Sequence, residues 1–383
     1  MAYQSAMENY EVWFCHSMTS VILLTESVGP ESPHHYHKRG WCNLESMLCR
    51  LLKTRRADLW DPVVDVGNPS NRHLQPPMSL EAFKELIDFS YFPNPSDGSL
   101  VLRLYGRALH RALGGAEVLR YDHARWGDLE METLAACLPL CASLKVLHLK
   151  RNLFQATGFI TFSKALGRGA LSNLRELDLS NNDQVNDWRG ALLSLADAVS
   201  PRVPGASAGL PRLQELCMQD CKFGHESFFY FCRALMEGSL VKLQRLNVDG
   251  NGVANSGIDP IVAALERGAL PSLQMVMGVP DEGAQTFRDV LLHLQHLRRL
   301  SGRIDTKQDD ASRRSGTAAK LSFSGDEVNK IDKRIKVARE HLDRSRRANV
   351  PPLALKLAPA GNREQPRPQG MTSSRMTIRP VQF

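Results

Sequence analysis

Hydrophobic positions recur at a fixed spacing through the middle of this chain. Each copy follows the pattern Leu-x-x-Leu-x-Leu-x-x-Asn, and Met, Val or Cys replaces single members in some copies. Successive copies begin 30, 39, 30 and 30 residues apart, and a period of this length is typical of repeat architectures. The longer interval holds a Pro-, Gly- and Ala-rich stretch at 200–209, which predicts a loop. The four clear copies are Leu144/Leu147/Leu149/Asn152, Leu174/Leu177/Leu179/Asn182, Leu213/Leu216/Met218/Cys221 and Leu243/Leu246/Val248/Asn251.

Each copy predicts a short strand, a turn and a returning helix. The leucines of the strand point inward, the Asn or Cys satisfies the turning backbone, and apolar residues at helical spacing follow, as in Phe159, Phe162 and Leu166. One such unit cannot bury its own apolar face, so neighbouring units are expected to stack on a continuous core. The pattern therefore predicts an α/β fold over residues 116–300, with degenerate first and last units near Ala116 and Leu273.

This pattern resembles the ribonuclease-inhibitor-type branch of leucine-rich-repeat proteins, of the kind common in protists and algae. The phrase from Gly169 to Asn182 carries much of the similarity. The resemblance implies a solenoid with a curved parallel sheet inside and helices outside. It also implies a function, because relatives of this type bind proteins through the concave face of the sheet.

The residues beside the inner leucines are predicted to project from that face, since successive strand residues point to opposite sides. They mix charges and include no long apolar strip, which favours a protein partner of unknown identity, without a nucleic acid, a small molecule or a cofactor. The alternative is that they only solvate the sheet. The first row is Val146, Glu176, Glu215 and Arg245; the second is His148, Asp178, Cys217 and Asn247; the third is Lys150, Ser180, Gln219 and Asp249.

Residues 1–73 predict a separate small α/β segment. An apolar strand at 20–25 precedes a loop, and a helix opens at Trp41 and extends to about Lys53. This order resembles the later half of TIR domains, in which the residue matching Glu45 is catalytic in members that cleave NAD. The chain begins too late to hold the earlier strands, so the segment is either a truncated domain or a degenerate one. The competing interpretation of Glu45 is a first-turn helix acid stabilised by the helix dipole.

Residues 74–115 predict one or two helices that cover the amino-terminal end of the solenoid. Ser79 has the character of an N-cap, and Leu80, Phe83 and Ile87 form an apolar stripe behind it.

The last segment, residues 301–383, predicts a disordered basic tail. It holds 18 Lys and Arg against 9 Asp and Glu, so the net charge of +7 comes from this tail rather than from the repeats. A capping-box spacing from Ser324 to Glu327 opens an amphipathic pattern, which predicts a helix over 325–347. That helix either docks on a partner or stays solvated.

Composition narrows the function further. No apolar run is long enough to span a bilayer, no signal peptide is evident, and the eight cysteines are expected to be free thiols, which together favour a cytoplasmic protein. His34, His35 and His37 crowd one loop without the spacing of a zinc site, so no metal is expected. No hydrolase, nucleotide-binding or metalloprotease motif occurs, so we expect a non-enzymatic interaction module.

Overall fold

The computed structural model describes residues 10–16, 19–25, 32, 35–51, 63–67, 74–200, 209–253, 259–278 and 289–290. The chain divides into two compact units, residues 1–316 and 317–383, and every described residue belongs to the first. The predicted loop at 200–209 lies almost entirely outside the described residues, as does the predicted helix over 325–347.

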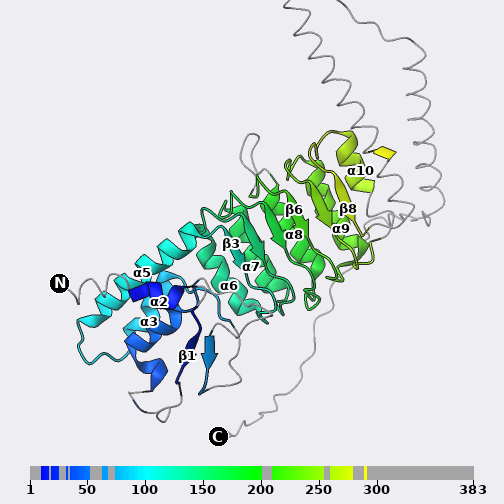
Figure 1. Ribbon diagram of the computed structural model, residues 1–383. Helices are drawn as coiled ribbons and strands as arrows, with labels where there is room; N and C mark the ends of the chain where they lie inside the picture. Colours follow the sequence, from blue (N-terminus) through cyan, green and yellow to red (C-terminus); the bar gives the residue numbers. More distant parts are fainter. Residues whose placement is uncertain are drawn as a thin grey trace, which may run out of the picture. The chain divides into compact units, whose positions relative to one another are not determined.

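The larger of the two sheets in the described structure has six parallel strands (Figure 1). Its strand order equals the chain order, and the middle residue of each central strand is a buried leucine. The fold is therefore α/β, as the sequence predicts. The strands are β3 (Val118–Arg120), β4 (Val146–His148), β5 (Glu176–Asp178), β6 (Glu215–Cys217), β7 (Arg245–Asn247) and β8 (Met275–Met277).

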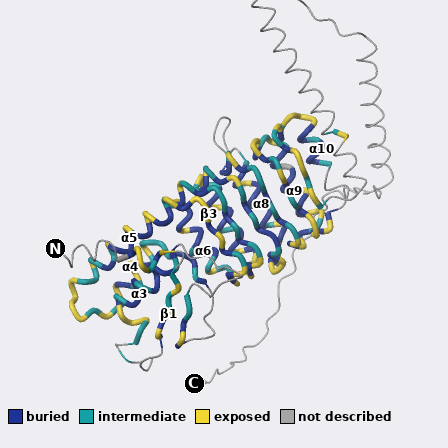
Figure 2. Tube along the Cα trace, in the orientation of Figure 1, coloured by how far each residue is buried: buried dark blue, intermediate teal, exposed yellow. Residues whose placement is uncertain are grey.

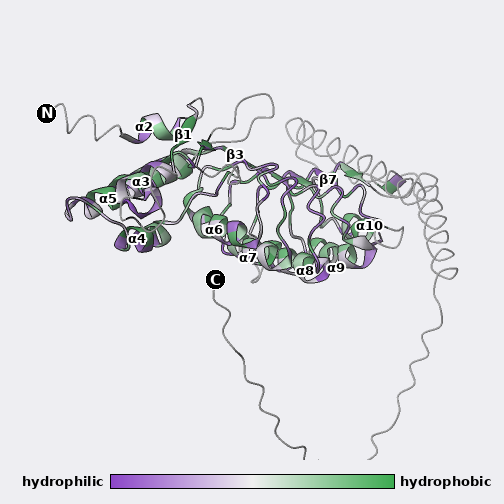
Figure 3. Ribbon diagram, turned by 90° about the horizontal axis from the view of Figure 1, so that it is seen from below, coloured by the Kyte–Doolittle hydropathy of each residue, from purple (hydrophilic) through white to green (hydrophobic). Residues whose placement is uncertain are grey.

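A helix follows each of the first five strands, and these helices form a row on one side of the sheet (Figure 3). Consecutive helices contact one another, and their buried residues belong to the same hydrophobic core as the buried leucines of the strands. Buried positions recur along both the helices and the strands (Figure 2). Aromatic rings link neighbouring units, because Trp188 lies 5.5 Å from Phe159 and 5.6 Å from Phe223 between ring centroids. The helices are α6 (Asp128–Cys137), α7 (Ala156–Gly167), α8 (Trp188–Val199), α9 (Gly224–Met236) and α10 (Asp259–Glu266).

The turns after the strands are held by the Asn and Cys side chains that the pattern singled out. Asn182 is fully buried, and its amide donates to the carbonyls of Leu149 (3.1 Å) and Leu179 (2.6 Å). Its oxygen accepts from the backbone N–H of Asn152 at 2.7 Å. At the equivalent position Cys221 donates its thiol to the Leu179 carbonyl at 3.2 Å. The predicted structural role of this position is confirmed.

In the N-terminal segment the structure describes helices and a small two-stranded sheet. Strand β1 (Val21–Leu23), within the predicted strand, pairs in parallel with β2 (Val63–Asp65), which the sequence did not predict. Two helices occupy 74–115, and Ser79 caps the first by accepting from the N–H of Ala82 at 3.2 Å. The elements are α2 (Tyr10–Cys15), a 3-10 turn (Tyr36–Lys38), α3 (Gly40–Leu48), α4 (Leu80–Asp88) and α5 (Asp97–Gly115).

Two predictions for α3 are wrong. The helix ends at Leu48 rather than near Lys53, because the N–H groups of Arg50 and Leu51 donate only three residues back, to the carbonyls of Met47 and Leu48. Glu45 is the sixth residue of the helix, which begins at Gly40, so it is not a first-turn acid beside the positive end of the dipole.

The N-terminal helices and the large sheet share one hydrophobic core, which extends from Cys15 to Leu273. Trp126, after β3, donates its indole N–H to the carbonyl of Leu74 at 2.5 Å, and Cys137 donates its thiol to the carbonyl of Pro77 at 3.2 Å. Helix α5 contacts the 3-10 turn at Leu138–Leu140. The predicted division into four segments stays a prediction.

Candidate binding surface

The strand register brings the predicted site residues together in rows. The first residues of the strands are direct partners across β4, β5, β6 and β7, and so are the third residues. We call the surface made by these first and third residues the open face, since the middle residues are buried on the helix side. The first row is Val146, Glu176, Glu215 and Arg245, and the second is His148, Asp178, Cys217 and Asn247.

The third predicted row lies just beyond the strands and is also aligned. Backbone bonds connect one turn to the next, such as Arg151 N–H to the Ser180 carbonyl and Asn181 N–H to the Gln219 carbonyl. Side chains reinforce this order, because the Ser180 hydroxyl accepts from the Gln219 N–H at 3.3 Å. Lys150, Ser180, Gln219 and Asp249 therefore follow one another along the carboxyl ends of β4 to β7.

The rows extend one strand further at each end than the sequence analysis recognised. Val118 and Arg120 of β3 align with Val146 and His148, and Met275 and Met277 of β8 align with Arg245 and Asn247. These residues were missed because the first and last units depart from the leucine pattern. The sequence does contain a signal for them. In the degenerate first and last copies, residues on either side of the inward-pointing position alternate as they do in the clear copies.

A histidine between two carboxylates occupies one end of the open face. His148 Nε2 lies 2.7 Å from Glu176 Oε1, and its Nδ1 lies 3.8 Å from Asp122 Oδ2. The Asp122 carboxylate raises the pKa of His148; burial opposes this rise and Glu176 adds to it. Burial acts to raise the pKa of Asp122, but hydrogen bonds from His148 and from the Lys150 N–H outweigh it and lower that pKa. Asp122 was another residue that sequence reasoning missed.

The centre of the open face is acidic. Glu215 is paired with Arg245 of the next strand, and Asp178 accepts from the N–H of Ser180 at 2.9 Å. Burial raises the pKa of the Cys217 thiol to about 12, and the neighbouring carboxylates of Asp178 and Glu215 add to this effect. Cys217 is therefore a protonated thiol at neutral pH, which makes it a poor nucleophile.

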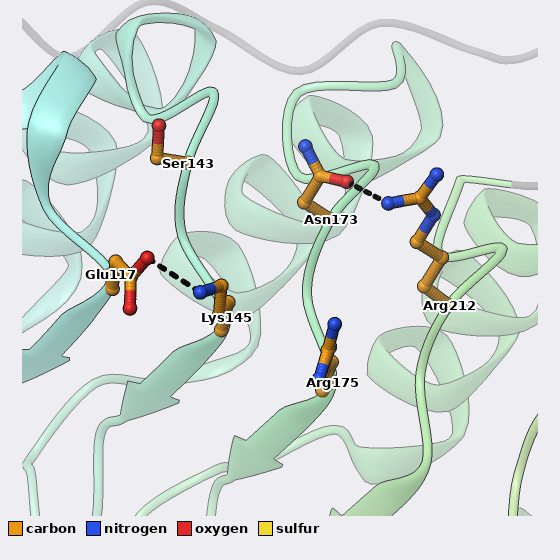
Figure 4. Close-up of a pocket in the computed structure, with 6 residues that line it drawn as sticks. All are labelled: Glu117, Ser143, Lys145, Asn173, Arg175 and Arg212. Atoms are coloured by element: carbon orange, nitrogen blue, oxygen red, sulfur yellow. Dashed lines mark hydrogen bonds and ion pairs between the residues drawn. The ribbon is translucent and has the colours of Figure 1, made fainter.

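A small hollow lies at a second place, the amino-terminal edge of the same sheet (Figure 4). Its volume is about 230 Å³. The leucine pattern gives no signal for this edge, because its residues lie in the short links before the strands. The lining residues are Glu117, Ser143, Lys145, Asn173, Arg175 and Arg212.

The candidate residues of the N-terminal segment are distant in the sequence from the open face and from the hollow. Trp41 and His37 have contacts with other residues of the N-terminal segment. Glu45 is half-buried on α3, and the Trp41 indole packs against the core while donating to Asp97 at 3.0 Å. His35 and His37 have ring centroids 5.6 Å apart. Within the described ranges, no group of three or more His, Cys, Asp or Glu residues has the arrangement of a metal site. His34 lies outside those ranges.

The eight cysteines are all free thiols, as predicted, and all but Cys217 are buried. In the part of the chain that the structure describes, no helix is long and apolar enough to cross a membrane.

These features define an α/β protein built on a six-stranded parallel sheet with one open face. No protein-family model and no curated protein matches the sequence.

Proposed function

We propose that this chain is a leucine-rich-repeat solenoid of the ribonuclease-inhibitor type, and that it acts as a non-enzymatic module for binding a protein partner. Three observations support the proposal: the strand order follows the chain order, the helices lie on one side, and Asn or Cys side chains bond neighbouring turns. In this arrangement the open face is the concave face of the solenoid.

The observation that carries the binding proposal is the in-register alignment of half-exposed polar side chains along that face. Each strand contributes its first and third residues at the strand spacing of about 4.8 Å, so a partner meets a regular array rather than scattered groups. Such an array suits an extended protein surface, because interfaces combine many modest polar contacts with a few dominant ones.

The charges of the array specify the kind of partner. Glu176, Asp178 and Glu215 form an acidic centre, and both glutamates already have a basic neighbour, His148 and Arg245 respectively. The Asp178 carboxylate has no ion pair with another described residue. It lies two residues after Glu176 on β5, and Glu176 is the direct partner of Glu215 on β6. A Lys or Arg side chain of a partner would complete this centre, since a charge-assisted bond to a carboxylate is stronger than a neutral one.

The test is affinity capture from native lysate with the full chain as bait. The double variant Glu176→Lys/Glu215→Lys reverses the acidic centre, and Glu176→Gln/Glu215→Gln removes its charge without adding a repulsive one. We expect a protein retained by the wild type to be lost with the first variant and weakened with the second.

The matched control is Glu132→Lys/Glu266→Lys, which makes the same charge change at exposed sites on α6 and α10. A specific partner must be retained by this control, and all variants must keep the wild-type melting temperature within a few degrees. Equal capture by the open-face variants and the wild type would refute the assignment of binding to the open face.

A further inference from the structure

The hollow at the amino-terminal edge of the sheet has an unbalanced charge. Three of its six lining residues are cations, Lys145, Arg175 and Arg212, and only Glu117 is acidic. The six lining residues come from the links that enter β3, β4, β5 and β6, so four successive units contribute to the hollow (Figure 4).

The three cations differ in their contacts. Lys145 Nζ pairs with Glu117 Oε1 at 2.5 Å, which neutralises it. Arg212 donates to the side-chain oxygen of Asn173 at 2.6 Å, and Asn173 in turn donates to the Ala142 carbonyl at 2.8 Å, so a neutral group holds Arg212. The guanidinium of Arg175 has no hydrogen bond or ion pair with any residue that the structure describes, and no dashed line reaches it in Figure 4.

The backbone at this edge explains why the cations stay close together. The N–H of Arg175 donates to the Lys145 carbonyl at 2.8 Å, and the N–H of Gln214 donates to the Arg175 carbonyl at 2.8 Å. These bonds hold neighbouring links at the strand spacing of about 4.8 Å. Arg175 and Arg212 therefore lie on neighbouring links, and a bound anion would be attracted to both guanidinium groups.

The fold itself does not require these cations. Gln214, Gln244 and Gln274 occupy the same position before β6, β7 and β8, and each makes the same backbone bond to the preceding link. A neutral Gln therefore serves the structure as well as Lys145 or Arg175 does. The backbone bonds of this edge therefore do not explain the charges of Lys145 and Arg175.

We propose that this hollow binds a phosphate-type oxyanion, the phosphoryl group of a phosphate monoester. A guanidinium offers two parallel N–H donors that match two oxygens of such a group, and Arg175 and Arg212 supply two of them. The Ser143 hydroxyl and the Lys145 ammonium complete a set of donors. The volume is below the roughly 300–1,000 Å³ of pockets for drug-sized ligands, so it fits a small group.

A carboxylate in the lining selects against broader anionic surfaces. Glu117 lines the hollow, so a flat membrane or a nucleic-acid backbone would meet a negative charge beside the cations. A single phosphoryl group avoids it. Binding here does not depend on the partner proposed for the open face.

The test is an NMR titration of the full chain with inorganic phosphate at constant ionic strength, observing the arginine Nε–Hε signals. We expect saturable shifts at Arg175 and Arg212 that chloride does not reproduce. The variant Arg175→Gln, which copies the natural residue at 214, should weaken phosphate binding at least about tenfold, measured at the Arg212 signal.

Two further variants separate binding from folding. Arg103→Gln, at an exposed site on α5, should bind phosphate as the wild type does. Glu117→Gln frees Lys145 and should tighten binding by about threefold or more, a gain that a damaged fold would not produce. Linear shifts alike in all variants, or equal affinity of wild type and Arg175→Gln, would overturn the proposal.

Parallel titrations identify the source of the phosphoryl group. A short peptide with one phosphoserine is compared with its serine counterpart and with inorganic phosphate. Tighter binding of the phosphopeptide than of free phosphate assigns the site to a modified side chain, and equal affinity assigns it to a free ion; both support the hollow as a phosphoryl site. Binding only to vesicles that contain anionic lipid would refute it.

Discussion

His148 shows how single residues on the open face depend on their neighbours. Its side chain is 17% exposed and lies between Asp122 of the preceding unit and Glu176 of the following one. The sequence predicted that His148 projects from the sheet. It did not predict the two carboxylates, because their contact depends on the register of three strands and on side-chain rotamers. These two carboxylates couple the protonation of His148 to the folded structure.

We expect this coupling to appear as a pH dependence of stability. The pKa of His148 is raised in the folded state, chiefly by Asp122, so the folded protein holds the proton more tightly than the unfolded chain does. The resulting stabilisation is complete below the unfolded pKa of about 6.5 and is lost as the pH rises through the folded pKa. The free energy of unfolding of the wild type should therefore fall relative to that of His148→Gln between pH 6 and pH 9.

Chemical denaturation at a series of pH values measures this difference. His225→Gln, at an exposed site on α9, is the control and should run parallel to the wild type. The contribution of Asp122 stays constant in this range, because its pKa is lowered and its stabilisation is lost only in acid. Parallel curves for the wild type and His148→Gln would contradict the assigned coupling.

At the scale of elements, the turns after the strands determine how one unit connects to the next. Trp126 N–H donates to the Asn152 side chain at 3.0 Å, and Cys221 N–H donates to the Asn251 side chain at 2.8 Å, so the same bond recurs across the sheet. The pattern in the sequence predicted this role, because only a side chain with both a donor and an acceptor satisfies the turning backbone in this way.

Removal of one of these side chains should destabilise the protein measurably. Asn182→Ala leaves the buried N–H of Asn152 without its acceptor, and an unsatisfied buried group costs about 1–3 kcal/mol. We expect the free energy of unfolding to fall by about that amount. The exposed Gln184→Ala should change it by less than about 0.5 kcal/mol. A comparable effect of both substitutions would show that the turn bond is not the source of the loss.

Elements outside the periodic region were harder to predict. Strand β1 was predicted from its β-branched and aliphatic residues, but its partner β2 lies about forty residues later, in a short run without a pattern of its own. The end of α3 was misplaced by five residues, because no Gly or Pro marks it in the sequence. The local sequence signal was weak for β2 and for the end of α3, and contacts between residues distant in the sequence determined both.

At the largest scale, the described residues combine a continuous core with contacts between neighbouring strands and neighbouring helices. Each strand of the large sheet pairs only with the strands beside it, and helices α6 to α10 contact in chain order. The core nevertheless extends without a break into the N-terminal helices through Trp126 and Leu74. Stability in such an arrangement is close to a sum of local terms.

A core substitution should therefore act locally. Leu246→Ala in β7 removes a fully buried side chain and should cost about 2–5 kcal/mol. Hydrogen exchange should accelerate more in β6, β7 and β8 than in β3 or α5, because the distant elements keep their own neighbours. Equal acceleration throughout the described residues would indicate a single cooperative unit and would contradict this expectation.

The sequence by itself determined the α/β class, the positions of the six strands and the rows of the open face across β4 to β7. It could do so because the alternation of side chains and the regular period leave one register that buries every strand leucine. Only the tertiary structure decided the contacts of His148, the pairing of β1 with β2 and the cationic hollow before β4 and β5. These depend on side chains from different units that meet across the sheet, and no local pattern records such distances.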